Sequence, residues 1–203
     1  EFVHKNKSLF ILDEIVTGFR FRYGCLYPTM KLDPDIVTLG KIAGGGMAIG
    51  IICGKKEIME YADTTGKKKS ERSYIGGGTF SANPTSMTSG YTTLNYLKTK
   101  RITYEKINSL GDYARKELEK VFDGKVIVTG KGSLFMTHFL KNNITQITNS
   151  TDVAKCNSEM LQKYHFKMIS QDGIFFLPGK LGAISNSHSK EDIKKIIQAS
   201  ENF

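Results

Sequence analysis

Two side chains that could share one reaction follow two short apolar segments of the chain. Asp13 comes directly after residues 8–12, and Lys41 comes after residues 35–39, close to three consecutive glycines. Polar residues at the carboxyl ends of buried strands are where open α/β sheets place their chemistry. A lysine beside an apolar floor can form a Schiff base, and a carboxylate can hold a proton on a heteroaromatic nitrogen, which is what pyridoxal phosphate requires of a protein. The alternative is that Asp13 caps a turn and Lys41 is solvated.

Other common catalytic motifs are absent from the sequence. No Gly-Lys pair stands in a P-loop, and Ile49 occupies the place of the last glycine that a dinucleotide fingerprint would need after Gly44. The four histidines are scattered, and the three cysteines are far apart and outside any C-x-x-C spacing. We therefore expect no metal site and no disulfide framework.

The elements that must position these residues can be read from the apolar periodicity. A helix end is expected at 1–7, buried strands at 8–12, 35–39 and 49–53, and a helix from Pro84 to about Leu97 with Asn83 as its N-cap. The glycine-rich loop 76–81 before that helix could bind a phosphate. In the second half we expect helices at 109–122, 152–166 and 190–199, strands at 126–128, 134–136 and 174–177, and a turn at 142–143.

Three motifs give these elements a family resemblance. Residues 12–20 (LDEIVTGFR), 34–46 (PDIVTLGKIAGGG) and 78–84 (GTFSANP) resemble, in order and at natural intervals, the signatures of class III aminotransferases, which are fold type I enzymes that use pyridoxal phosphate. Residues 186–193 (NSHSKEDI) resemble the segment that precedes the family's last helix. The resemblance covers the whole chain and implies an α/β fold.

The resemblance also implies roles for individual residues. Lys41 is the Schiff-base lysine and proton carrier, and Asp13 pairs with the pyridine nitrogen. Ile15 presses on one face of the cofactor ring, while Gly78 and Thr79 bind the phosphate across a subunit boundary, so a homodimer is expected.

The motif variants are most similar to the glutamate-1-semialdehyde aminomutase branch of the family. That branch implies isomerisation of an amino aldehyde to 5-aminolevulinate, a tetrapyrrole precursor. Ala48 and Ala82 depart from the family pattern, which expects proline and glycine there. Three alternatives stay open: a general class III transaminase with separate amino donor and acceptor, a basic binding module, and a non-catalytic structural partner.

The resemblance maps to the carboxyl half of such an enzyme. We therefore expect residues 1–100 to be part of a large domain with a mostly parallel sheet, residues 101–203 to be a small α+β domain, and this chain alone to be nearly inactive. The first residue is Glu1, and the longest apolar stretch, Met47–Cys53, is far too short to cross a bilayer. The net charge of +9 favours anionic ligands, but no aromatic residues interleave with Lys67–Lys69 as nucleic-acid stacking would need. We expect a cytoplasmic enzyme with a small-molecule substrate and no nucleic-acid or membrane partner.

Overall fold

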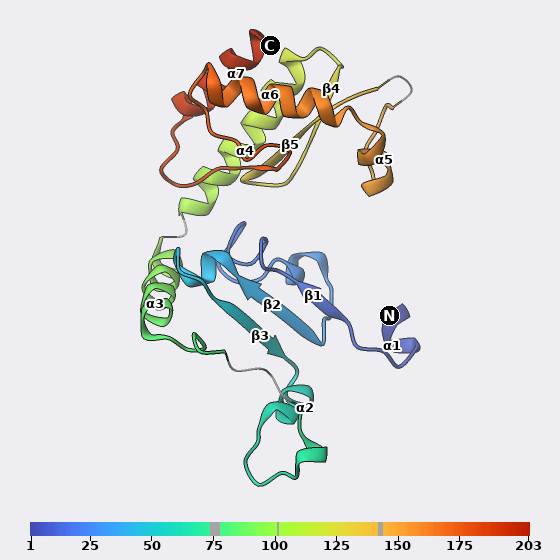
Figure 1. Ribbon diagram of the computed structural model, residues 1–203, viewed down its shortest axis with the longest axis vertical. Helices are drawn as coiled ribbons and strands as arrows, with labels where there is room; N and C mark the ends of the chain where they lie inside the picture. Colours follow the sequence, from blue (N-terminus) through green and yellow to red (C-terminus); the bar gives the residue numbers. More distant parts are fainter. Residues whose placement is uncertain (74–77, 101, 142–143) are drawn as a thin grey trace. The chain divides into compact units, whose positions relative to one another are not determined.

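The computed structural model describes residues 1–73, 78–100, 102–141 and 144–203 (Figure 1). The chain divides into two compact units, Glu1–Arg101 and Ile102–Phe203. The predicted turn at 142–143 and the first glycines of the loop 76–81 lie outside the described residues. None of the described helices is long and apolar enough to cross a membrane.

The first unit contains a sheet of three strands in the order β1 (Ile11–Asp13), β2 (Ile36–Gly40) and β3 (Gly50–Gly54) (Figure 1). β1 runs parallel to β2, and β3 runs antiparallel to it. The short helix α1 (Phe2–Lys5) precedes β1, and α2 (Lys56–Met59) follows β3. The three strands predicted in this half are thus present, and their sheet is mixed.

The two faces of this sheet differ in burial. Val37 and Leu39 are buried on one face. On the other face Ile11 is 60% exposed and Ile52 is 46% exposed, and together with Leu9 and Ile36 they line an open apolar hollow. The prediction of a buried strand at 8–12 is therefore wrong on this face, where Leu9 and Ile11 are exposed.

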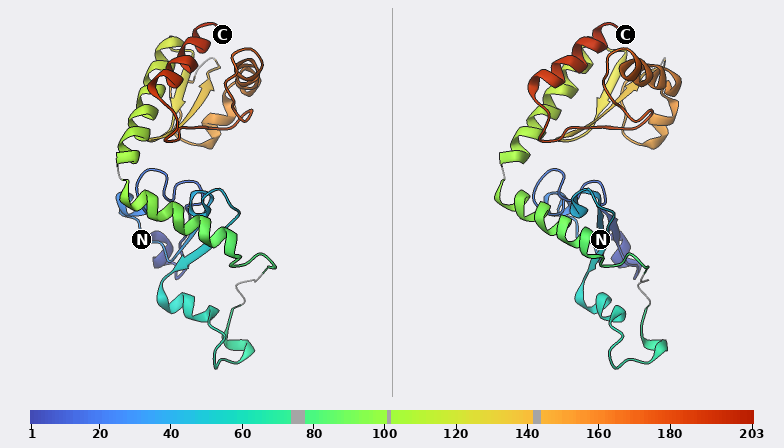
Figure 2. Two further views of the ribbon diagram at one scale, coloured as in Figure 1. Left: turned by 90° about the vertical axis from the view of Figure 1, so that its left-hand side faces the viewer. Right: turned by 60° about the vertical axis from the view of Figure 1, so that its left-hand side comes forward.

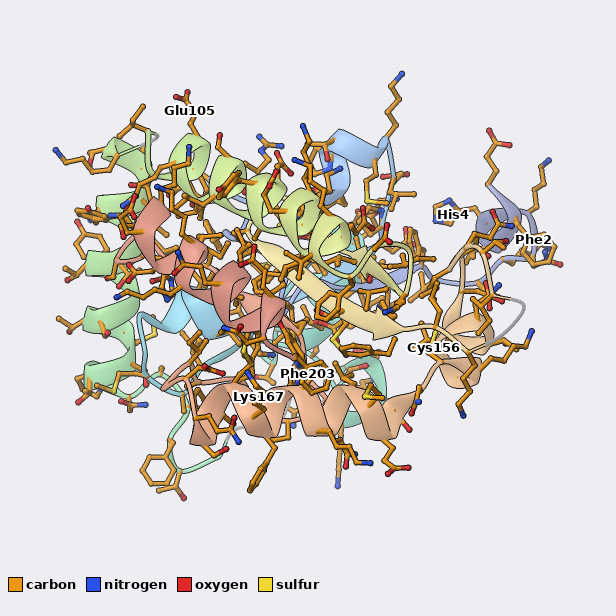
Figure 3. All side chains as sticks on the ribbon, turned by 90° about the horizontal axis from the view of Figure 1, so that it is seen from above. Phe2, His4, Glu105, Cys156, Lys167 and Phe203 are labelled. Carbon is orange, nitrogen blue, oxygen red and sulfur yellow. The ribbon has the colours of Figure 1, made fainter. Side chains whose placement is uncertain are left out.

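Asp35 ties the beginning of β2 to three other segments. Its carboxylate accepts a hydrogen bond from Lys55 Nζ at 2.8 Å and from the backbone nitrogen of Phe10 at 2.7 Å. His4 is a side chain of α1 (Figure 3), and its Nε2 lies 2.8 Å from Oδ2 of Asp35. The hydrogen bonds from Lys55, Phe10 and His4, in this order of effect, hold the pKa of the Asp35 carboxyl well below its ordinary value.

The helix α3 (Pro84–Thr99) begins as its sequence predicts, and Figure 2 shows its length along the first unit. Asn83 is the N-cap, since its side chain accepts from the backbone nitrogen of Ser86, and Pro84 fills the first helical position. The helix packs on the 3-10 turn η2 (Lys41–Gly44) that follows β2.

The second unit holds four helices and a small antiparallel sheet among its described residues. The strands are β4 (Val126–Thr129), β5 (Leu134–Phe139) and β6 (Gly182–Ala183), and the helices are α4 (Ile102–Val121), α5 (Ser150–Lys155), α6 (Ser158–Ser170) and α7 (Lys190–Glu201). α4 packs against α7, beside which it runs in Figure 2. α7 begins with a capping box between Ser189 and Asp192.

Three predictions for the second unit are wrong. α4 begins seven residues before the expected position, at Ile102. The single helix expected at 152–166 is two helices, because Asn157 leaves the helical conformation and caps α6 with its side chain. Residues 174–177 form no strand; β6 pairs with β5 instead, through Ala183 opposite Leu134.

Aromatic side chains from several elements form the core of the second unit. Tyr164 of α6 is fully buried, and its ring meets those of Phe122, Phe139 and Phe203 edge to face at 5.3 to 5.7 Å between centroids. Phe203, the last residue, thus packs on α6. Figure 3 labels Phe203 together with Lys167, which is a residue of α6. His165 is also buried and stacks on Phe176, so it is a core histidine.

Candidate active site

The structure places Asp13 and Lys41 at the carboxyl ends of neighbouring parallel strands. Asp13 ends β1 and stands opposite Thr38 of β2, and Lys41 is the first residue after β2. Both side chains are exposed. Oδ1 of Asp13 accepts a hydrogen bond of 2.8 Å from the backbone nitrogen of Ile15, which fixes one orientation of the carboxylate. The two candidates therefore share one edge of the sheet.

The backbone of Lys41 is in the left-handed region, with φ 45°. This conformation costs a residue with a Cβ about 1 kcal/mol or more, so the surrounding structure must impose it. Gly40 before it is fully extended, and the chain turns sharply into η2 at Lys41. Among the described residues, Nζ of Lys41 makes no hydrogen bond or ion pair.

Ile15 lies beside the glycine that precedes Lys41. A Cβ built on Gly40 would lie 3.4 Å from Cγ2 of Ile15 and 3.2 Å from the carbonyl oxygen of Ile49. Gly40 also pairs with Gly50 of β3, so two residues without side chains face each other where the strands end. The structure thus brings Ile15, Asp13 and Lys41 together around backbone that is free of side chains.

Two serines of α3 hold the loop that follows Lys41, and sequence reasoning did not identify them. Oγ of Ser86 donates to the carbonyl oxygen of Ala48, and Oγ of Ser89 donates to that of Gly45, each at 2.8 Å. One signal for them was available: hydroxyl side chains three residues apart lie on the same face of a helix.

Gly78 and Thr79 do not line the hollow that Lys41 lines. Both are exposed, and the backbone nitrogen of Gly78 donates to Oγ of Ser81 at 2.9 Å in the turn before α3. Thr79 lines a hollow with Ala48–Gly50, whereas Lys41 lines another with Gly46–Ala48. The structure therefore does not bring Thr79 into the hollow of Lys41.

The groups at the sheet edge fit pyridoxal phosphate. The cofactor needs an amine to bind its aldehyde and a carboxylate for its ring nitrogen, and Lys41 and Asp13 supply these from adjacent strand ends. Two glycines near them, Gly46 and Gly50, are open, since an added Cβ at either would meet nothing within 4 Å. No group of histidine, cysteine and acidic side chains that could hold a metal ion occurs within the described ranges.

Comparison with known proteins decides the family. The family model for aminotransferase class-III matches residues 1–178. This chain belongs to the class III aminotransferases. The class III aminotransferases are enzymes that depend on pyridoxal phosphate, and one solved transaminase with 25% identity and a TM-score of 0.81 holds it.

Individual relatives of this class III chain include aminomutases and transaminases. It is 37% identical over 200 residues to glutamate-1-semialdehyde 2,1-aminomutase 1 of Staphylococcus epidermidis, covering 96% of the chain and 44% of that protein. The aminomutase of Sulfolobus acidocaldarius is 34% identical over 190 residues, covering 92% and 43%. An omega-transaminase from Sphaerobacter thermophilus superposes with a TM-score of 0.82 at 25% identity, covering 99% and 45%.

These matches confirm the fold type I assignment and the cofactor class. They also show that this class III chain spans less than half the length of the relatives it matches.

Proposed function

We propose that this chain carries the cofactor lysine and the ring-nitrogen carboxylate of an aminomutase that converts glutamate-1-semialdehyde to 5-aminolevulinate. The observation that carries the proposal is the placement of Asp13 and Lys41 at the ends of two parallel, hydrogen-bonded strands. The names and identities of the aminomutase relatives support the choice of reaction. The remainder of the active site would come from polypeptide beyond this chain.

Each residue has a role that its position supports. Lys41 would hold the cofactor through Nζ and, once released, carry a proton between the carbon atoms of the reacting groups. Asp13 would keep a proton on the pyridine nitrogen, and Ile15 would lie against one face of the ring. When bound, pyridoxal phosphate supplies an electron sink for the bonds at the amino-bearing carbon.

Gly78 and Thr79 would bind the cofactor phosphate of a second copy of the chain. Their exposure supports a role toward another subunit. The start of α3 adds the positive end of a helix dipole, which favours a phosphate. The functional unit is then a homodimer.

Selective labelling of Lys41 tests the proposal. The chain is incubated with substoichiometric pyridoxal phosphate, treated with borohydride and digested, and the modified lysine is located by mass spectrometry. We expect label mainly on Lys41 and its loss in Lys41→Ala. Lys56→Ala is the matched control, because Lys56 is also an exposed lysine of the first unit. Label spread evenly over the exposed lysines would contradict the proposal.

A general transaminase is the second candidate, and the similarity to the omega-transaminase of Sphaerobacter thermophilus favours it. It would need a separate amino donor, whereas the aminomutase would not. A basic binding module that uses the Lys67–Arg72 loop instead predicts salt-sensitive binding of nucleic acid that survives Lys41→Ala.

A further inference from the structure

The carboxylate next to Asp13 is buried and fully engaged. Glu14 is only 2% exposed. Its Oε2 accepts from the backbone nitrogen of Leu26 at 2.7 Å and from Oγ1 of Thr17 at 3.0 Å, and its Oε1 accepts from the backbone nitrogen of Tyr27 at 2.7 Å. An ionised carboxylate has only acceptor sites, so it suits three donors that converge on one buried point.

The backbone around Glu14 connects this buried group to Asp13. The nitrogen of Glu14 donates to the carbonyl oxygen of Thr38 at 2.9 Å, which extends the pairing of β1 with β2 by one residue. The nitrogen of Gly18 donates to the carbonyl oxygen of Glu14 at 2.8 Å and closes a turn. The nitrogen of Ile15, inside this turn, is the donor that orients Asp13. Any movement of the turn therefore moves the hydrogen bond to the Asp13 carboxylate.

The same turn also reaches the residue before Lys41. Ile15 lies against Gly40, and Gly18 packs so tightly on Leu39 that an added Cβ would stand 2.5 Å from its side chain. Leu39 and Gly40 are the last two residues of β2. The turn 14–18 thus contacts both strand ends that carry the candidate residues.

We propose that Glu14 is a positioning residue: its buried carboxylate fixes the turn 14–18 and thereby sets Asp13 against the ring nitrogen of the cofactor. The inference rests on the function proposed above. Asp13 acts on the cofactor directly, while Glu14 acts through Asp13. The competing explanation is that Glu14 only fastens the loop 17–27 to the sheet and has no bearing on how Asp13 is oriented.

A pair of probes separates the two explanations. Pyridoxal phosphate and its analogue with CH in place of the ring nitrogen carry the same aldehyde and phosphate, and they differ only where Asp13 would act. The measured quantity is the ratio of labelling yields at Lys41 after borohydride reduction. A general loosening of the fold lowers both yields and leaves their ratio unchanged, whereas displacement of Asp13 lowers the ratio.

The variants define the expected outcome. We expect Asp13→Asn to lower the preference for pyridoxal phosphate about tenfold, as loss of a charge-assisted hydrogen bond does. Glu14→Gln should lower it in the same direction, by about threefold or more, because the amide places a donor against backbone donors. Thr17→Val, which removes one of the three donors to Glu14, should give a smaller decrease and guards against misfolding of Glu14→Gln. Glu57→Gln, an exposed change in the same unit, is the matched control.

Each contrary result has a separate meaning. If the unchanged chain shows no preference for the ring nitrogen, the proposed role of Asp13 is wrong and the role of Glu14 is wrong with it. If Asp13→Asn lowers the ratio while Glu14→Gln and Thr17→Val keep it, Asp13 retains its role and only the positioning role of Glu14 is overturned.

Discussion

Gly90 of α3 lies directly against the carbonyl oxygen of Ala43, two residues after Lys41. A Cβ on Gly90 would stand 2.5 Å from that oxygen, and the obstacle is backbone. The absence of a side chain at Gly90 therefore allows α3 to pack directly on the loop after Lys41. The hydrogen bonds of Ser86 and Ser89 hold the same loop.

This contact predicts the effect of Gly90→Ala. Alanine favours a helix over glycine by roughly 1 kcal/mol, but the forced shift of backbone costs about 1–3 kcal/mol, so we expect a net loss of up to about 2 kcal/mol in the free energy of unfolding. Urea unfolding followed by circular dichroism measures it. Gly50→Ala, where an added Cβ meets nothing within 4 Å, is the control. If Gly90→Ala is as stable as the unchanged chain or more stable, α3 can move away from the carbonyl oxygen of Ala43 at little cost.

The left-handed backbone of Lys41 predicts that two substitutions differ in stability. Lys41→Gly relieves the conformational strain, whereas Lys41→Ala retains it, so the glycine variant should be more stable by about 1 kcal/mol. At most positions glycine is the less stable of the two. Thermal unfolding of both variants gives the comparison, and a more stable alanine variant would contradict strain at this residue.

The depressed pKa of Asp35 predicts that the chain loses stability in acid. Its pKa is depressed in the folded chain by hydrogen bonds from Lys55, Phe10 and His4, so its contribution is present above the ordinary carboxyl pKa near 4 and is lost as the pH falls below it. Asp35→Asn should therefore destabilise the chain at pH 7 and differ less from the unchanged chain at pH 3. Asp33→Asn, at an exposed partner of the same Lys55, is the control. A difference that is the same at both pH values would contradict the assignment.

The raised pKa of Tyr164 predicts that the chain loses stability in base. Burial raises the pKa of its hydroxyl to about 12, while the hydrogen bond with Ser200 opposes that rise. A folded pKa above the unfolded value near 10 adds stability at neutral pH that disappears between about pH 10 and 12. Tyr164→Phe should be less stable than the unchanged chain at pH 8. It should also lose less stability between about pH 10 and 12, because it has no hydroxyl to ionise. Tyr91→Phe, at a tyrosine that is 71% exposed, should lose as much stability over this range as the unchanged chain.

An aminomutase and a transaminase differ in whether they need a separate amino donor, and this difference can be measured. The chain can be fused after the amino-terminal part of the Staphylococcus epidermidis aminomutase that it does not span. The fusion should convert glutamate-1-semialdehyde without an added amino donor, and Lys41→Ala should abolish conversion. The relative joined to its own carboxyl part at the same position tests the junction. Conversion only when an amino donor is added would favour the transaminase.

Sequence patterns predicted the first unit well because its signals are local. Asn83 and Pro84 define the start of α3 by capping chemistry alone, and the apolar runs before Asp13 and Lys41 place both at strand ends. The exposure of Ile11 could not be predicted, because an apolar run does not specify what covers it. The roles of Ser86 and Glu14 depend on contacts between segments that are distant in the sequence.

The errors in the second unit have a common physical cause. Residues 174–177 have the composition of a strand, yet Phe176 packs on His165 and Phe135 instead of entering a ladder. Tertiary packing outweighed β propensity there. At Asn157 the side chain caps a new helix, and apolar periodicity alone does not distinguish such a capping residue from a helix interior.

The register of β1 decides which of two neighbouring acids can meet a ligand. Asp13 is exposed and Glu14 is buried because successive residues of a strand point to opposite faces. Inserting one residue in this three-residue strand would move Asp13 into the place of Glu14, toward the backbone donors of Leu26 and Tyr27, and would turn Glu14 outward. In homologous chains, length changes should therefore be tolerated in residues 19–25 far more readily than between Ile11 and Gly18.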